Sequence, residues 1–259
     1  MRFIFLSFLL IPFCNLQGQI TPPGMGETNT ASWVAVGTLH HLDQSEKISL
    51  LNYLGLGSIS EMSSMNPFHR VAIYVVSNEL KYKFNKNWNA AIGINYDWQN
   101  IAAKSDVYSS NGLTGKQEIR IFTKLSYVYN KQAIKYTVTV RPEYRSFYNS
   151  DFSSYTEVNQ FRLRLKGASS IPLNAQKTQK LIVGVEFLGA SSKHLNWEAF
   201  NYKDCRMSIY YSLTFPEANI KLDIGYMNDL CTQGDIKDAS YLGVNLLFLD
   251  LFKRNEKAQ

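Results

Sequence analysis

The sequence predicts an all-β fold, an antiparallel up-and-down transmembrane β-barrel. Three observations lead to this prediction. Polar and apolar residues alternate over most of the chain, the N-terminus carries an export signal, and aromatic residues gather at both ends of the apolar face. The chain has 259 residues, and no linker or change of composition divides it. We therefore expect a single barrel domain after the export signal.

Residues 133–147, AIKYTVTVRPEYRSF, show the alternation clearly. Every second residue from Lys135 to Arg145 is polar, and the residues between them, from Ile134 to Tyr144, are apolar, aromatic or proline. Successive side chains of a strand point to opposite faces, so this strand has one charged face and one apolar face. The same period of two recurs at 75–84, 88–99, 116–129, 160–166, 180–188, 204–215 and 219–226.

The N-terminus has the features of a secretory signal peptide. Arg2 supplies a positive charge, residues 3–13 form the apolar run FIFLSFLLIPF, and the chain then becomes polar around Gly18. Cys14 does not indicate a lipoprotein, because the bulky Phe13 precedes it where a small residue is needed. The predicted division of the chain is a signal peptide at 1–18, a Pro- and Gly-containing leader at 19–30, the barrel at 31–252 and a polar tail at 253–259.

The strand count is predicted from the marked segments and from a parity rule. Eleven segments read as strands: 31–41, 47–58, 71–84, 88–99, 116–129, 133–147, 157–171, 178–191, 203–215, 219–228 and 240–252. Bacterial single-chain barrels have even numbers of strands. We therefore expect twelve strands, with ten as the alternative if 31–41 lies outside the ring.

The connections between these segments alternate in length, which is typical of a chain that threads back and forth through a membrane. Short connections are expected at 85–87, 130–132, 172–177 and 216–218. Long loops are expected at 100–115, 148–156, 193–202 and 229–239.

Aromatic residues mark the two edges of the apolar face. Trp88 and Trp98 lie ten residues apart on that face, which at about 3.3 Å per residue on a tilted strand spans roughly 23–24 Å, close to the height of a membrane band. The predicted aromatic girdles comprise Tyr82, Phe84, Trp88, Tyr96, Trp98, Tyr127, Tyr129 and Tyr144. This spacing favours an apolar face against lipid and a charged face around a lumen. A soluble barrel or sandwich, with the same alternation turned inside out, is the alternative.

The predicted lumen is basic. Its basic cluster comprises Arg120, Arg141, Arg145, Arg162, Arg164, Lys166 and Arg206, and its acidic partners are Glu118, Glu143, Glu186 and Asp204. Two interpretations stay open. The charges either form cross-strand ion pairs that plug a narrow barrel, or they line a porin-like pore that prefers anions.

Two other classes of function remain as alternatives. The long loops, with Trp197, Phe200 and Tyr202, could make the barrel a surface-binding or scaffold protein. An outer-membrane lipid-modifying hydrolase is less favoured, because no spacing of serine and histidine singles out a catalytic group, and we expect no enzyme activity, no cofactor and no metal.

The expected partners are outer-membrane lipid and either small anions or a surface partner, and the oligomeric state stays open. Nucleic acid is not expected, although the sequence pI is about 9.0, because the basic residues of an exported barrel would face inward.

The mature chain would keep two cysteines, Cys205 and Cys231. Both are expected at the long-loop end of one hairpin, where a disulfide forms only if the two Cα atoms lie within about 7 Å. Two free thiols, with Cys205 facing lipid, are the alternative.

Several stretches resemble a known family. They are NELKYKFNKNW at 78–88, EIRIFTKLSYVYN at 118–130, and RPEYRSFY followed by QFRLRLK. In these stretches the chain is similar to the exported Gram-negative proteins called domain of unknown function 2490 (DUF2490). The resemblance implies a barrel in the cell outer membrane of a Gram-negative bacterium. It implies no activity and no catalytic residues.

Overall fold

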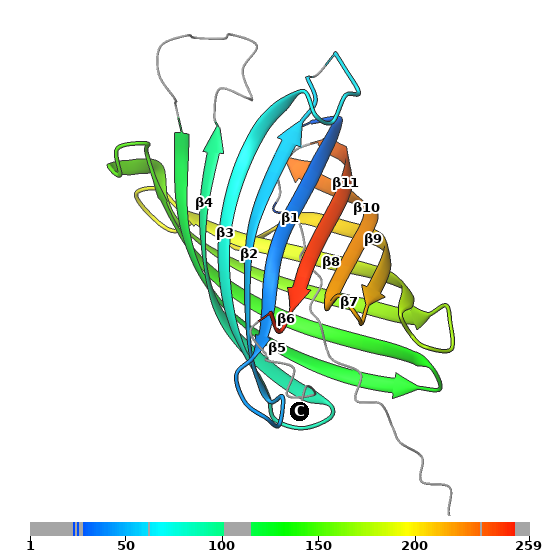
Figure 1. Ribbon diagram of the computed structural model, residues 1–259. Helices are drawn as coiled ribbons and strands as arrows, with labels where there is room; N and C mark the ends of the chain where they lie inside the picture. The colour runs from blue at the N-terminus through cyan, green and yellow to red at the C-terminus, as the bar shows by residue number, and fades with distance from the viewer. Residues whose placement is uncertain are drawn as a thin grey trace, which may run out of the picture.

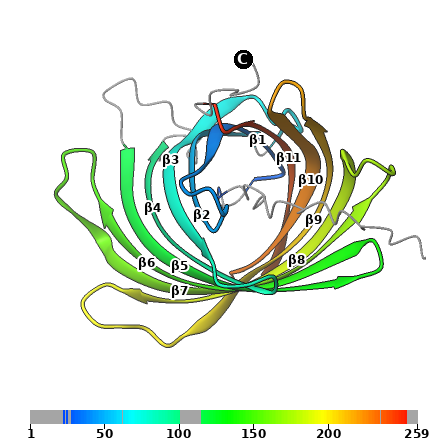
Figure 2. The ribbon, with the colours of Figure 1, turned by 60° about the horizontal axis from the view of Figure 1, so that its bottom comes forward.

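The computed structural model describes residues 23, 25, 28–61, 63–100, 115–233 and 235–251. These residues form one closed barrel of eleven strands (Figures 1 and 2). The strands are β1 (Thr30–His41), β2 (Ile48–Ile59), β3 (Arg70–Lys83), β4 (Trp88–Asn100), β5 (Gly115–Lys131), β6 (Ile134–Tyr148), β7 (Ser154–Pro172), β8 (Gln179–Lys193), β9 (Asn201–Phe215), β10 (Ile220–Gln233) and β11 (Asp235–Leu249).

The expected counts of twelve and ten strands are both wrong for the described chain. Residues 31–41 belong to β1, which lies in the ring between β2 and β11. In an up-and-down meander with an odd number of strands, the first and last strands run in the same direction. β1 and β11 accordingly pair in parallel, from Thr30 opposite Ser240 to Leu39 opposite Leu249, while every other neighbouring pair is antiparallel. The alternation of side chains contains no information about how a barrel closes.

The two ends of the barrel differ in their connections. The turns at 42–47, 84–87, 132–133, 173–178 and 216–219 lie at one end, called here the short-turn end. The connections at 60–69, 149–153 and 194–200 lie at the other, the long-loop end. The predicted loop at 229–239 is wrong, because β10 and β11 extend through it as a tight hairpin whose last pair is Gln233 and Asp235.

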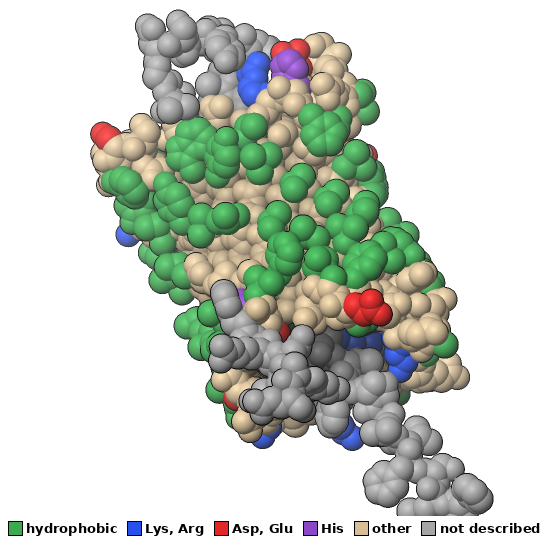
Figure 3. Space-filling view, viewed as in Figure 1, with side chains coloured by type: hydrophobic (Ala, Val, Ile, Leu, Met, Phe, Trp, Pro, Cys, Tyr) green, Lys and Arg blue, Asp and Glu red, His purple; other side chains and the backbone are tan. Residues whose placement is uncertain are grey.

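The two faces of each strand point as their chemistry predicts. On β6, the side chains of Val138 and Tyr144 are 50% and 46% exposed, whereas Glu143 and Arg145 are 1% and 6% exposed. Large apolar side chains therefore cover the outside of the barrel, and Figure 3 shows them spread over the strands between the two ends. We call this surface the outer apolar band.

The inside of the barrel has two chemically different halves. The inward residues of β1, β2 and β11 are mainly apolar, aromatic or glycine, and together with Met227 of β10 the largest buried ones include Trp33 and Tyr241. Trp33 donates from Nε1 to Oδ1 of Asn245 at 3.1 Å, which ties β1 to β11 across the parallel pairing. The buried charged residues gather on the inward faces of β4 to β10. This apolar half was not predicted from the sequence, because inward and outward residues were not assigned to the segments that form β1, β2 and β11.

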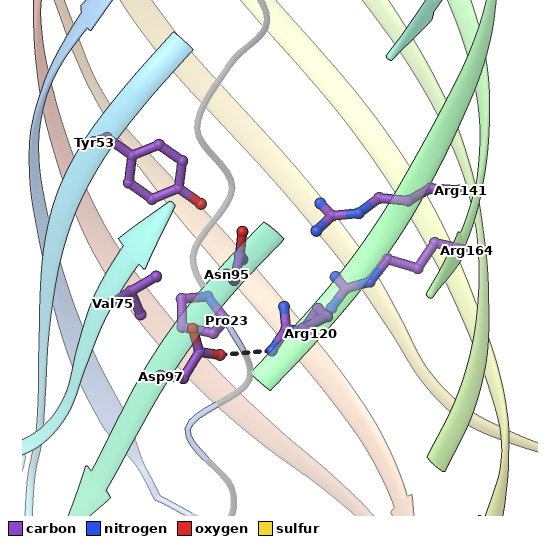
Figure 4. A pocket seen from close by; sticks show the side chains of 8 residues that line it. All are labelled: Pro23, Tyr53, Val75, Asn95, Asp97, Arg120, Arg141 and Arg164. Carbon is purple, nitrogen blue, oxygen red and sulfur yellow. Dashed lines mark hydrogen bonds and ion pairs between the residues drawn. The ribbon is translucent and has the colours of Figure 1, made fainter. Parts of the chain in front are cut away.

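Two residues of the leader lie inside the barrel. Met25 is 4% exposed and packs in the same buried cluster as Trp33 and Tyr241. Its backbone N–H donates to the Tyr241 hydroxyl at 3.2 Å. Pro23 lies deeper, beside the charged half (Figure 4). Pro23 and Met25 thus occupy part of the lumen.

The predicted signal peptide at 1–18 and the polar tail at 253–259 lie outside the described residues. Within the described ranges, no helix is long and apolar enough to cross a membrane.

Packing in the apolar half predicts that Gly55 tolerates no side chain. A Cβ atom at Gly55 would lie 2.1 Å from Cη2 of the buried Trp33, whereas a Cβ atom at Gly167 would meet only Val185, at 3.9 Å. Gly55→Ala should lower the free energy of unfolding by about 1–3 kcal/mol through overpacking. Gly167→Ala should leave it unchanged or raise it by about 0.4–1 kcal/mol. Urea unfolding of both variants, refolded in lipid vesicles, compares them, and equal effects would contradict this packing.

Candidate functional site

The charged half of the lumen contains two groups of side chains. The arginine belt, on β4 to β7, comprises Arg120, Arg141, Arg145, Arg162 and Arg164 with the carboxylates of Asp97, Glu118 and Glu143. The Arg206 group, on β8 to β10, comprises Arg206 with Glu186, Asp204 and Asp229. All residues of the predicted basic cluster and its acidic partners lie on inward faces of their strands, including Lys166, which is opposite Glu186 in the register of β7 and β8.

The strand registers place arginines directly opposite one another. Arg120 pairs with Arg145 between β5 and β6, and Arg141 pairs with Arg164 between β6 and β7. Like charges in opposite positions of a sheet destabilise it. Each pair therefore needs a carboxylate between its members.

Glu118 supplies the carboxylate for the first arginine pair. Its Oε1 accepts from Nε of Arg120 at 2.8 Å and from Nε of Arg145 at 2.6 Å. Arg120 also donates to Oδ2 of Asp97 at 2.7 Å. These side chains are almost completely buried, so the ion pairs are shielded from water. Each buried charge therefore depends on its oppositely charged partner.

Glu143 supplies the carboxylate for the second arginine pair. Its Oε1 lies 2.7 Å from Nε of Arg141 and 2.9 Å from Nε of Arg164, and its Oε2 lies 3.8 Å from Nε of Arg120. The register places Arg162 opposite it as well. One buried glutamate thus faces four arginines. The Arg141 guanidinium also stacks over the Phe122 ring, with 3.9 Å between its Cζ and the ring centroid.

In the Arg206 group, carboxylates outnumber arginines. Arg206 contacts Asp204 and Asp229 at 3.1 Å each and Glu186 at 3.8 Å. Glu186 also accepts from Nη1 of Arg164 at 2.8 Å, which joins the two groups into one web of ion pairs from β4 to β10. The sequence interpretation missed Asp229, because its segment was taken for a loop.

A small cavity lies in the arginine belt. Its lining residues are Pro23, Tyr53, Val75, Asn95, Asp97, Arg120, Arg141 and Arg164. Figure 4 shows the arginines of β5, β6 and β7 reaching toward Pro23 and Asn95, with the Tyr53 ring on the other side of this space. The cavity volume is about 10 Å³, room for about one water molecule. Asp97, Arg120 and Arg164 are buried here, so side chains crowd this part of the bore.

The predicted girdle residues all point outward. Six of them are 39–53% exposed: Tyr82, Phe84, Trp88, Tyr127, Tyr129 and Tyr144. At the short-turn end the rings contact one another, Tyr82 with Phe84 and Trp88 with Tyr127, each with centroids 5.0 Å apart. Toward the long-loop end, Trp98 packs against Tyr74 at 5.6 Å, and the Tyr96 hydroxyl donates to Gln117. Tyr96 and Trp98 are partly covered by these contacts.

The loop aromatics and the histidines do not form a catalytic arrangement among the described contacts. Trp197, Phe200 and Tyr202 are about half exposed at the long-loop end. His41 pairs with Asp250 at 2.8 Å, at the short-turn end of the β1–β11 pairing. His194 lies at the other end, 3.4 Å from Glu198.

The structure does not contain the Cys205–Cys231 disulfide. Cys205 is a free, buried thiol. The register of β9 and β10 places Cys205 opposite Leu230 and Cys231 opposite Asp204, so the two cysteines are not opposite one another. The side chain of Cys231 lies outside the described residues.

The geometry of Glu143 predicts that the web depends on its charge. Glu143→Gln would leave Arg141 and Arg164 buried without their shared carboxylate and should lower the free energy of unfolding by about 3–5 kcal/mol. Glu217→Gln, in the exposed turn at 216–219, should change it by less than about 0.5 kcal/mol. Urea unfolding in lipid vesicles measures both. Equal stabilities would show that the web does not need this carboxylate.

The comparison with known families agrees with the resemblance seen in the sequence. None of the curated proteins compared with this chain matches it. The family model described as "Protein of unknown function (DUF2490)" matches residues 59–238, a range that includes most of the barrel and all of the arginine belt. The chain is therefore a member of the DUF2490 family.

Proposed function

We propose that this protein is an integral barrel of the cell outer membrane of a Gram-negative bacterium, with its lumen held closed by the web of ion pairs. The observation that carries the proposal is the pairing of an apolar exterior with a charged, buried interior on the same strands. A water-soluble barrel requires the reverse arrangement.

The outer apolar band supports residence in lipid. Its members include Val138, Ile92, Leu125, Leu163 and Ile209, each 39–54% exposed. Soluble monomers rarely expose contiguous apolar patches of more than a few hundred Å². The strands have 12–19 residues, longer than the usual five or six, and a tilted strand needs about 9–11 residues to cross a bilayer.

The two ends of the barrel support an orientation. Barrels of the outer membrane have short periplasmic turns and longer extracellular loops. The short-turn end, with the ring contacts of Trp88 and Tyr127, would face the periplasm. The long-loop end, with Trp197 and Phe200, would face outward.

The crowded bore supports a closed lumen over an open pore. Glu118 and Glu143 hold the arginines in place, and the cavity beside them has room for about one water molecule. Pro23 and Met25 occupy further space. Selective conduction needs a continuous path past such charges.

Substitutions on the two faces of β6 test the membrane assignment. The wild type should appear in the outer-membrane fraction as a band whose electrophoretic mobility changes on heating. Val138→Arg, on the outer apolar band, should destabilise the inserted barrel by about 2–4 kcal/mol if residue 138 lies near the bilayer midplane, and so reduce assembly. The matched change Thr137→Arg, on the inward face, should be milder. Recovery of the wild type in a periplasmic extract without detergent, or equal effects of the two variants, would contradict the proposal.

Bilayer recordings test the closed lumen separately. The purified, folded wild type should give no steady conductance in a planar bilayer, because side chains crowd the bore at the arginine belt. A steady anion-selective current, weakening in high salt, would instead favour the anion-preferring pore. In that case, joint replacement of Arg141, Arg162 and Arg164 by Gln should move the reversal potential toward zero.

A further inference from the structure

The arginine belt is electrostatically unbalanced. Five guanidinium groups, Arg120, Arg141, Arg145, Arg162 and Arg164, share three carboxylates within the belt, Asp97, Glu118 and Glu143. The outside carboxylate that contacts the belt, Glu186, also serves Arg206. Burying an uncompensated charge is costly. The web as a whole contains six arginines and six carboxylates, so the surplus is local to the belt, where a bound anion would lower the free energy.

The cavity lies between three arginines of the belt. Arg141 and Arg164, which share the single Glu143, both line it, together with Arg120. Arg164 and Arg120 are 3% and 4% exposed. Asp97 also lines the cavity, but its charge is engaged by Arg120 at 2.7 Å. The side chains around the cavity thus offer a surplus of N–H donors.

The remaining lining residues complete a pocket for an anion. The Ser77 hydroxyl donates to Oδ1 of Asn95 at 2.7 Å, which leaves the amide nitrogen of Asn95 available as a donor. The Tyr53 hydroxyl faces the same space (Figure 4), but it is hydrogen-bonded to Ser77 and supplies no free donor. Val75 and Pro23 contribute apolar surface, which limits access of water. Charge-assisted hydrogen bonds in such an enclosed site are stronger than in water.

The cavity volume selects the kind of anion. About 10 Å³ accommodates a single particle of about the size of a water molecule. Chloride and bromide are larger than water but smaller than sulfate and phosphate, so a halide ion is the common anion that needs the least widening of the cavity. We propose that the cavity between Arg120, Arg141 and Arg164 binds one halide ion, which serves as an internal counter-ion of the closed lumen. This inference does not require that the barrel spans a membrane.

Halide titration of stability tests the proposal. Purified wild-type protein, folded in detergent, should show a saturable rise of about 2–4 °C in apparent melting temperature when gluconate is replaced by chloride or bromide at constant ionic strength. Sulfate at the same ionic strength should not reproduce it. Crystals grown in bromide should show one anomalous peak inside the cavity.

Two lumen variants and one control distinguish binding from general salt effects. Asn95→Asp keeps the acceptor for Ser77 and adds a carboxylate at the cavity, so it should abolish the halide response. Arg141→Gln should abolish it as well, by removing a donor. Lys83→Gln, inward-facing near the short-turn end and not part of the cavity lining, should keep it.

Three results would overturn the proposal. The first is an equal response to gluconate, sulfate and chloride. The second is an unchanged halide response in Asn95→Asp, which tests the site even if Arg141→Gln does not fold. The third is a cavity that contains only water in the bromide crystals.

Discussion

The structure depends on two glutamates that each hold a pair of like charges together. Alternation along β5, β6 and β7 sends arginines inward at positions that the registers then place opposite one another. Without Glu118 and Glu143, those strands would pair with repulsive charges at their centre. Each carboxylate lies between two arginines in this register. The ion pairs therefore favour the observed alignment of the three strands. A shift by one residue would send the guanidinium groups to the apolar exterior.

The lumen combines two ways of filling space. In the apolar half, the Trp33 ring lies against Gly55 of the neighbouring strand, and the Tyr210 ring of β9 reaches Gly225 of β10 and Gly243 of β11. In the charged half, long side chains meet at their polar ends and leave little free volume. The first relies on close packing and the second on paired charges. Met25 packs in the apolar half and Pro23 lies against the charged half, so the leader lies at the boundary between them.

Local patterns in the sequence predicted the faces of the strands, but long-range features could not be predicted from them. The inward positions of Arg141, Glu143 and Arg145 follow directly from a period of two. The partners of those residues depend on register, which is set by all strands together, and so the bridging role of Glu143 between Arg141 and Arg164 was not visible. Asp229 was lost because a polar residue near a strand end resembles a loop residue, although its burial against Arg206 makes it part of the strand. The predicted number of strands was wrong because it depends on how the first and last strands pair, and the alternation within single strands does not show this.

The parallel pairing of β1 and β11 has a consequence for the order of assembly. β1 begins at the long-loop end, while Pro23 and Met25 lie inside the ring. In a finished ring, these two residues would have to insert among side chains already packed there, such as Trp33 and Tyr241. It is simpler for the strands to gather around Pro23 and Met25 while the ring is still open. The junction of β1 and β11, fastened by Trp33 to Asn245 and by His41 to Asp250, would then be the last to join. The contacts of Pro23 and Met25 inside the barrel would then form before β1 pairs with β11.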